Sequence, residues 1–349
     1  MKRVYFTFAI LVILQLPLFA QQADFSLVPY RKGNLWGYAD RDKNLVIQPV
    51  YDEANLFYLG YASVRKGNLF GYINKAGRLV IPYKFYSAKR FRYGYTDNVK
   101  TNGTDTVLFA GAALTEKDIE RCIDTRGKQM LKCPAINENT RPDSAVKLIT
   151  DTSISIYSTF RKSETFDKVV DGYKMPGSDD DYYIAMKGDQ FGVINNKFER
   201  IAPFEYTSIN KLVVGNSVYL IAKEHGLVGL LGGNGSVQLP LENTRIDPVT
   251  AANGKVYLIV TRNGNTGIKD LLLQQLVPEK YSDIQYNVAG GFLLTGTNGL
   301  KGYFFGNNKL IETGYTDITP LTGGNYIMTK NQVGKSGYIN DQGVEFFEQ

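Results

Sequence analysis

Short apolar segments alternate with short polar turns in the part of the chain that follows residue 60. Residues 61–64, 69–73 and 79–81 are rich in branched and aromatic side chains, which is typical of β-strands. Between them stand Lys66-Gly67-Asn68 and Asn74-Lys75-Ala76-Gly77, whose glycine and asparagine adopt turn conformations readily. The pattern predicts two linked hairpins made of about three short strands.

This segment repeats the one before it. Residues 30–54 match residues 64–88, and Gly37 and Gly71 stand 34 residues apart. Weaker copies follow from residue 183, and a glycine keeps its place in each of them. The seven repeat glycines are Gly37, Gly71, Gly192, Gly229, Gly267, Gly302 and Gly337. A period of this length indicates a tandem array of structural units.

The repeat glycines lie inside predicted strands, where glycine costs about 0.5–1 kcal/mol relative to alanine. Their recurrence predicts close approach of a neighbouring ring or backbone, or a bulge that bends the strand. A proline also recurs in the frame, at Pro49, Pro82, Pro203, Pro240 and Pro278. Because proline lacks a donor for the ladder, we expect it to end the last strand of each unit.

Three strands of four or five residues cannot bury enough apolar surface alone, so each unit must stack on its neighbours. We therefore expect an all-β fold, a tandem array of about eight or nine antiparallel hairpin units of ~35 residues. An open, curved stack is the favoured arrangement. A closed β-propeller is the alternative, although its blades usually hold four strands.

The sequence divides into four parts: 1–20, 21–91, 92–181 and 182–349. The second and fourth carry clear copies, whereas the third is degenerate and contains an insertion near 103–120. Thr115-Glu116-Lys117-Asp118 predicts one short helix there, because it matches a weak capping pattern. Phe166-Asp167-Lys168-Val169 resembles Tyr51-Asp52-Glu53-Ala54 and indicates a further copy.

Residues 1–20 predict a secretory signal peptide. A basic start is followed by an apolar run that ends at Ala20, the expected cleavage site. An uncleaved membrane anchor is the alternative, whereas no later apolar run is long enough to span a bilayer. We expect an exported protein of the periplasm, cell envelope or medium, without stable membrane insertion after cleavage. Loss of Lys2 and Arg3 lowers the net charge from +6 to +4, which does not indicate nucleic-acid binding.

Cys122 and Cys133 flank a predicted hairpin turn at 123–128. In an exported protein the pair predicts a disulfide, and the alternative is two buried small apolar side chains. A metal site is not expected, because the chain has two cysteines and a single histidine, His225. We expect no cofactor.

Several short motifs resemble functional sites but have simpler structural interpretations. Asp40-Arg41-Asp42-Lys43-Asn44 opens like a calcium loop, yet the sixth and twelfth positions do not fit, so we expect a turn. Asp179-Asp180-Asp181 predicts a solvated loop, and the glycine-rich residues 232–235 and 263–267 predict hairpin turns. Residues 84–93 interleave basic and aromatic side chains, which favours half-buried strand aromatics; an anionic glycan or lipid head group is the alternative ligand.

The phrase Gly33-Asn34-Leu35-Trp36-Gly37-Tyr38, followed by Ile47-Gln48-Pro49 and Tyr51-Asp52-Glu53-Ala54, resembles the WG repeat of many bacterial proteins. The resemblance covers residues 30–91 well and 183–349 loosely. It implies an exported or envelope-associated β-repeat protein of interaction type. The family has no established catalytic residues to transfer.

We therefore expect a non-catalytic exported scaffold that binds a protein or peptide partner. The alternative is an envelope glycan-binding module that uses exposed Tyr and Phe side chains and Trp36. The single histidine excludes most hydrolase triads, although a carboxylate pair would permit a glycoside hydrolase. Ligand contacts are expected where the copies differ, above all at 92–181.

Overall fold

The computed structural model describes residues 23–98, 103–136, 166–322 and 325–348. The predicted signal peptide at 1–20 lies outside these ranges. All regular structure within them is β-strand, and they contain no helix long and apolar enough to cross a membrane. The chain forms two compact units, residues 1–142 and 143–349, which are described separately below.

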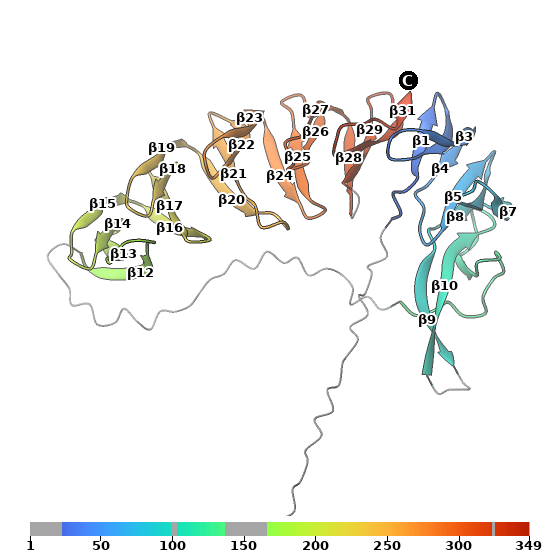
Figure 1. Ribbon diagram of the computed structural model, residues 1–349, viewed down its shortest axis with the longest axis horizontal. Helices are drawn as coiled ribbons and strands as arrows, with labels where there is room; N and C mark the ends of the chain where they lie inside the picture. The colour runs from blue at the N-terminus through green and yellow to red at the C-terminus, as the bar shows by residue number, and fades with distance from the viewer. Residues whose placement is uncertain (1–22, 99–102, 137–165, 323–324, 349) are drawn as a thin grey trace, which may run out of the picture. The chain divides into compact units, whose positions relative to one another are not determined.

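The first unit contains three antiparallel sheets (Figure 1). The first sheet is formed by β1 (Val28–Lys32), β2 (Leu35–Ala39) and β3 (Leu45–Tyr51). The second is formed by β4 (Glu53–Ala54), β5 (Tyr61–Lys66), β6 (Leu69–Asn74) and β7 (Leu79–Phe85). The third is formed by β8 (Ser87–Ala88), β10 (Gly103–Ala113) and β11 (Arg121–Ile123), and β9 (Arg92–Asn98) pairs with β10.

The second unit contains five sheets that follow one another along the chain (Figure 1). The fourth sheet is β12 (Lys168–Lys174), β13 (Asp181–Lys187), β14 (Gln190–Asn195) and β15 (Arg200–Tyr206). The fifth is β16 (Ser208–Val214), β17 (Ser217–Glu224), β18 (Leu227–Gly232) and β19 (Val237–Asn243). The sixth is β20 (Arg245–Thr250), β21 (Val256–Arg262), β22 (Asn265–Asp270) and β23 (Gln275–Tyr281). The seventh is β24 (Asp283–Asn287), β25 (Gly291–Thr295), β26 (Lys301–Phe304) and β27 (Leu310–Tyr315). The eighth is β28 (Asp317–Leu321), β29 (Tyr326–Lys330) and β30 (Ser336–Asn340), and β31 (Phe347–Glu348) follows it.

The prediction of a tandem all-β array is confirmed, but a complete sheet holds four strands and not three. In the second sheet the order β4-β5-β6-β7 follows the chain, and the fourth to seventh sheets have the same arrangement. The sequence pattern missed β4 because it is two residues long. Residues 51–54 therefore contain both the end of one sheet and the first strand of the next.

A single corner residue separates the last strand of one sheet from the first strand of the next. Its backbone N–H donates to a carbonyl of the next sheet, with N···O distances of 2.7–2.9 Å. The corner residues are Asp52, Tyr86, Thr207, Thr244, Ser282 and Thr316. Direct hydrogen bonding at the corner fixes each sheet to its predecessor without a flexible linker.

The corner side chains satisfy the adjoining sheet in two ways. The Thr207 hydroxyl donates to the Lys223 carbonyl at 3.0 Å, and three other hydroxyl corners make the same bond. The Asp52 carboxylate instead accepts from the N–H of Gly67 at 2.7 Å. Asp167 makes the equivalent bond to Gly188 at 2.8 Å, which confirms the further copy expected at residues 166–169.

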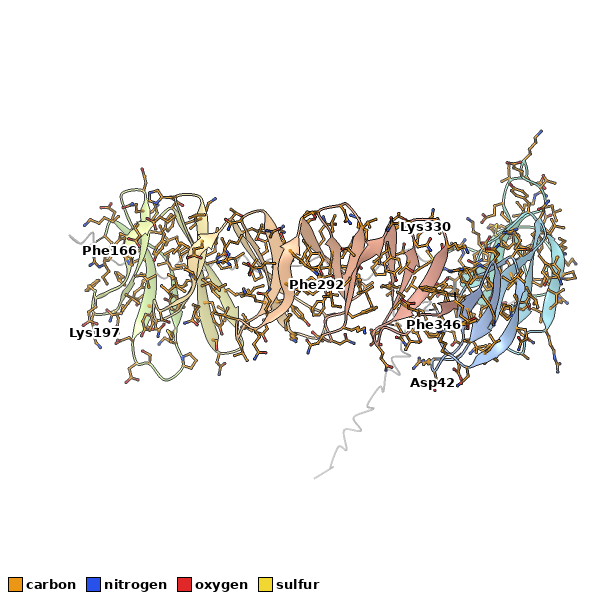
Figure 2. The ribbon with its side chains drawn as sticks, turned by 90° about the horizontal axis from the view of Figure 1, so that it is seen from above. Asp42, Phe166, Lys197, Phe292, Lys330 and Phe346 are labelled. Atoms are coloured by element: carbon orange, nitrogen blue, oxygen red, sulfur yellow. A yellow bond between two sulfur atoms is a disulfide. The ribbon has the colours of Figure 1, made fainter. Side chains whose placement is uncertain are left out.

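The core lies between successive sheets and is built from large aromatic side chains. Tyr38 and Tyr72 are fully buried, and their rings lie 4.9 Å from Phe57 and 5.0 Å from Phe91. Each tyrosine hydroxyl also donates to a backbone carbonyl, so its polar end is satisfied inside the core. Figure 2 shows side chains filling the space between the sheets of the second unit, with the buried Phe292 among them.

The repeat glycines face a bulge in the outermost strand. In the second sheet Phe70 pairs with Phe85 and Tyr72 with Ile81, so Gly71 alone stands opposite three residues. A Cβ atom on Gly71 would lie 2.6 Å from the Ile81 carbonyl oxygen, which no side chain can accept without displacement. The same shift recurs in the first, fourth, fifth, sixth and seventh sheets. Close backbone approach, one of the predicted causes, therefore explains five of the seven glycines, whereas a neighbouring ring, also predicted, lies nearest at Gly192 (Phe204) and Gly337 (Phe347).

The recurring proline does not end a strand, contrary to the prediction. Pro82 lies inside β7 and Pro203 inside β15, each at the first residue of the bulge. Residues in a bulge leave the regular ladder, so a missing N–H costs little there. The outer strand continues beyond the proline to the aromatic residue before the corner.

Candidate functional site

The third sheet departs from the repeat through a long inserted hairpin. β10 pairs with β9 over residues 103–109, and only its last residues pair with β8 and β11. The insertion predicted near 103–120 is thus a hairpin that starts at Arg92. The short helix predicted at 115–118 is wrong, because the Asp118 carboxylate accepts from the Thr115 N–H in a turn.

Arg121 occupies the position of a repeat glycine in this sheet. Ala112 pairs with Arg121 as Val64 pairs with Gly71, and Ala88 pairs with Ala112 as Ala54 pairs with Val64. An arginine fits here because the fourth strand stops after one bridge between Ile123 and Gln129. No bulge therefore passes over Arg121 within the described residues.

The chain that would complete the fourth strand takes another path. The Met130 N–H still donates to the Cys122 carbonyl, but the Leu131 side chain is fully exposed. Ala135 then pairs with Tyr95 of β9 through two backbone hydrogen bonds of 2.9 Å. Cys122 and Cys133 are joined by a disulfide with their Cα atoms 5.3 Å apart. The disulfide ties this crossing segment to β11.

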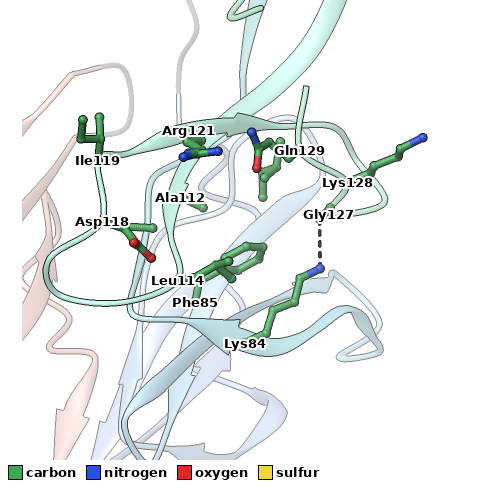
Figure 3. Close-up of a pocket in the computed structure, with 12 residues that line it drawn as sticks. Lys84, Phe85, Ala112, Leu114, Asp118, Ile119, Arg121, Gly127, Lys128 and Gln129 are labelled. Carbon is green, nitrogen blue, oxygen red and sulfur yellow. Dashed lines mark hydrogen bonds between the residues drawn. The ribbon is translucent and has the colours of Figure 1, made fainter. Parts of the chain in front are cut away.

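The missing strand leaves a pocket of about 420 Å³, called the Arg121 pocket (Figure 3). Its apolar surface comes from β7, β10, β11 and the loop between the last two. The lining residues are Lys84, Phe85, Ala112, Ala113, Leu114, Asp118, Ile119, Arg121, Ile123, Gly127, Lys128 and Gln129. Three cations and one carboxylate stand around this apolar surface, so the pocket favours a ligand that is both apolar and anionic.

Lys84 links the two sides of the pocket. Its ammonium group donates to the Gly127 carbonyl at 3.0 Å and lies 5.1 Å from the centre of the Phe85 ring (Figure 3). Asp124 stabilises the turn at residues 124–127, because its carboxylate accepts the backbone N–H groups of Arg126 and Lys128 at 2.9 Å. The floor and one wall are therefore preorganised.

The basic and aromatic stretch at 84–93 divides between core and surface. Phe85 and Phe91 are buried, as expected for strand aromatics, whereas Tyr86 and Tyr93 are exposed. The guanidinium of Arg92 lies 5.2 Å from the Phe109 ring, and its buried Nε has no hydrogen-bond partner in the described part of the chain. The stretch thus contributes both to packing and to a basic surface.

Two apolar side chains that line the pocket are exposed. Ile119 is 84 % exposed, and Leu114 is also exposed. Residues 84–136 carry ten Lys and Arg against six Asp and Glu, which gives this segment a net charge of +4. Exposed apolar side chains surrounded by charged ones are typical of a protein interaction site.

Several motifs have the structural roles that the sequence favoured. The Asp40 carboxylate accepts from the N–H of Asp42 and of Asn44, which forms a turn. The hydrogen bond from the Asn44 side-chain amide lowers the pKa of Asp40. Asp179 and Asp180 lie in the connection before β13, where Asp180 pairs with Lys197 at 2.9 Å, whereas Asp181 begins that strand. Within the described residues no group of three His, Cys, Asp or Glu side chains could hold a metal ion.

Other sequence candidates lie apart from the Arg121 pocket. His225 stands in the exposed turn between β17 and β18, with its Nδ1 3.2 Å from the Glu224 carboxylate. The glycine-rich residues 232–235 and 263–267 form turns and the start of a strand, as predicted. Trp36 is half-buried against the core between the first two sheets. Sequence reasoning missed Arg121, although aligning Cys122 with Tyr72 already places it under Gly71.

Comparison with known proteins supports the assignment of the sequence repeat and identifies no enzymatic activity. No curated protein matches the chain. Solved structures that resemble it include BBS1N in complex with ARL6DN. The two chains are 12 % identical, the match covers 84 % of this chain and 96 % of that chain, and the TM-score is 0.25. A catalytically inactive virginiamycin B lyase from Staphylococcus aureus with quinupristin has 12 % identity, coverages of 91 % and 97 %, and a TM-score of 0.22. The Dos1 propeller has 11 % identity, coverages of 88 % and 90 %, and a TM-score of 0.24.

The family model for the WG containing repeat matches residues 36–70 and 70–103. These matches cover the copies in which the glycine, the bulge and the corner residue are clearest. Gly37 and Gly71 occupy the same place in the two sheets, and Asp52 joins those sheets. The chain is a WG repeat-containing protein.

Proposed function

We propose that this protein is a non-catalytic, exported repeat scaffold that binds an acidic, extended segment of a partner protein in the Arg121 pocket. The observation that carries the proposal is the replacement of a repeat glycine by Arg121 where the fourth strand is missing. In the complete sheets this position is covered by backbone, and here it opens onto a pocket.

An extended partner segment suits the edge of β11 where it is open, at Arg121, beyond the pairing of Cys122 and Ile123 with residues 129–130. Peptides that add to a sheet edge gain affinity from backbone hydrogen bonds and specificity from pockets for alternate side chains. A partner apolar side chain would enter between Phe85 and Ile123, and an adjacent carboxylate would meet Arg121, while Lys128 adds positive charge at the rim. A bidentate arginine–carboxylate pair is stronger than a neutral hydrogen bond.

Site-specific photo-crosslinking in intact cells tests this proposal. A benzoylphenylalanine at position 119 is expected to cross-link one partner through an acidic segment that mass spectrometry can map. The same probe at the exposed Val213 of β16 is the matched control and is expected to give no such product. Cross-links that are absent, or identical from both positions, would refute the site.

Charge reversal tests the chemistry of the same contact. Arg121→Glu with Lys128→Glu is expected to reduce the cross-link from position 119 at least tenfold, because like charges then face the partner carboxylates. Lys187→Glu with Lys223→Glu, at exposed positions of β13 and β17, is the control with an equal change of net charge. An unchanged cross-link in the pocket variant would show that binding there does not depend on anionic groups.

A further inference from the structure

A second pocket lies in the second unit, at one end of three consecutive sheets. It has a volume of about 340 Å³ and is formed by the turns that follow β20, β24 and β26, together with residues from the turns after β28 and β30. This size falls at the lower end of the range for small-molecule sites. We call it the Tyr286 pocket.

Two partly exposed aromatic rings form the apolar part of this pocket. Tyr286 packs at 5.2 Å from the buried Phe292 ring, and its hydroxyl accepts from the Ala252 N–H at 3.3 Å. Phe305 lies against Tyr303 at 4.9 Å. Both rings are thus held by neighbours and keep part of their surface exposed to the pocket.

The polar part is neutral and amide-rich, unlike the basic rim of the Arg121 pocket. Asn253, Asn307 and Asn325 line it, and Asp341 is the one charged side chain among the described residues that do so. Within the described residues, the Asp341 carboxylate and the Asn325 amide have no hydrogen-bond partner. Asn307 is fixed by a bond from its amide to the Asp341 carbonyl at 3.0 Å.

Two glycines, Gly290 and Gly306, line the pocket, so no side chain narrows it at these positions. Gly290 and Gly306 have positive φ angles of 104° and 76°, which glycine adopts without strain. No atom stands within 4 Å of a Cβ built on Gly290. A flat ring can therefore approach the Tyr286 side of the pocket closely.

We propose that the Tyr286 pocket binds a neutral saccharide. A sugar hydroxyl both donates and accepts, so it can bond simultaneously to a carboxylate and to an amide N–H. The C–H face of a pyranose ring is apolar and matches an aromatic side chain, whereas a strongly anionic ligand would meet Asp341. This inference goes beyond the peptide-binding function and rests on a different pocket.

Saturation-transfer NMR with the mature protein tests it, using chitotetraose, cellotetraose and maltotetraose as probes and tetragalacturonate as the anionic comparison. At least one neutral probe is expected to receive saturation on its ring C–H protons and to bind more tightly than tetragalacturonate. No transfer to any neutral probe at millimolar concentration, or preference for the anionic one, would overturn the proposal.

Substitutions then locate the site. Asp341→Ala and Tyr286→Ala are each expected to weaken the bound probe at least tenfold, with circular dichroism checking that the strands remain. Asp189→Ala, in the turn between β13 and β14, is the matched carboxylate control and should not change the affinity. Tyr286→Phe keeps the ring and should lose less than Tyr286→Ala. Equal binding by all four variants would place the sugar elsewhere and refute the pocket, whatever the crosslinking at residue 119 shows.

Discussion

At the scale of single residues, one position behaves in opposite ways in neighbouring sheets. Gly71 is required because the Ile81 carbonyl lies where its side chain would be. Arg121 has the same register, and its long side chain fits because the covering strand is missing. At this position a glycine therefore indicates that the outer strand is present, and a large side chain indicates that it is missing.

We expect Gly71→Ala to destabilise the first unit by about 1–3 kcal/mol, the usual effect of overpacking. Arg121→Ala, at the same register, is the matched control and should leave the thermal unfolding temperature nearly unchanged. Circular dichroism melts of the two variants make the comparison. Equal melting temperatures for wild type and Gly71→Ala would contradict the steric explanation.

At the scale of elements, the disulfide holds a segment that replaces a missing strand. Residues 129–135 pair with β11 at one end and with Tyr95 of β9 at the other. The Cys122–Cys133 link closes the loop between these pairings. It therefore supports both the inserted hairpin and the wall of the Arg121 pocket.

We predict that peptide mapping without reduction recovers Cys122 and Cys133 in one cross-linked product. In the double serine variant, closing the loop no longer restricts the unfolded chain, which costs about 3 kcal/mol in the loop-entropy estimate. Hydrogen exchange should then accelerate at the amides of Tyr95 and Ala135, but not at Val64 in the second sheet. Unchanged exchange at Tyr95 would show that the disulfide does not support β9.

The elements also show how far the sequence could predict the structure. The repeat glycines, the turns at Asp40 and Asn74 and the copy at Asp167 were recognisable, because each depends on local residue chemistry. The strands β4 and β8 were not, since two residues carry no periodic signal and their pairing is non-local. The Arg121 pocket could not be predicted because it results from a strand that leaves its expected path.

At the scale of the whole molecule, buried tyrosines connect the sheets of each unit. Burial raises the pKa values of Tyr72, Tyr173 and Tyr303, and burial together with the Glu312 carboxylate raises that of Tyr281. These folded-state pKa values lie above the unfolded value of about 10. Their contribution to stability is therefore complete below pH 10 and is lost as the pH rises beyond it.

We expect alkaline unfolding in which part of the phenolate absorbance at 295 nm appears together with loss of the strand signal. Tyr72→Phe should lower stability at pH 7, because the hydroxyl bond to the Lys89 carbonyl is lost. That deficit should shrink above pH 10, since phenylalanine cannot ionise. Complete tyrosine ionisation with intact strands, or a deficit that does not depend on pH, would contradict this account.

The corner residues have a consequence for how such a chain can change in length. Each sheet takes its first strand from the end of the preceding sequence copy, as β4 follows Asp52. An exchange between two genes at equivalent points in the frame therefore adds or removes whole copies and keeps every corner intact. A break inside a copy instead separates a strand from its partners. Selection on folding alone would thus preserve the phase of the repeat while leaving the number of copies free to vary.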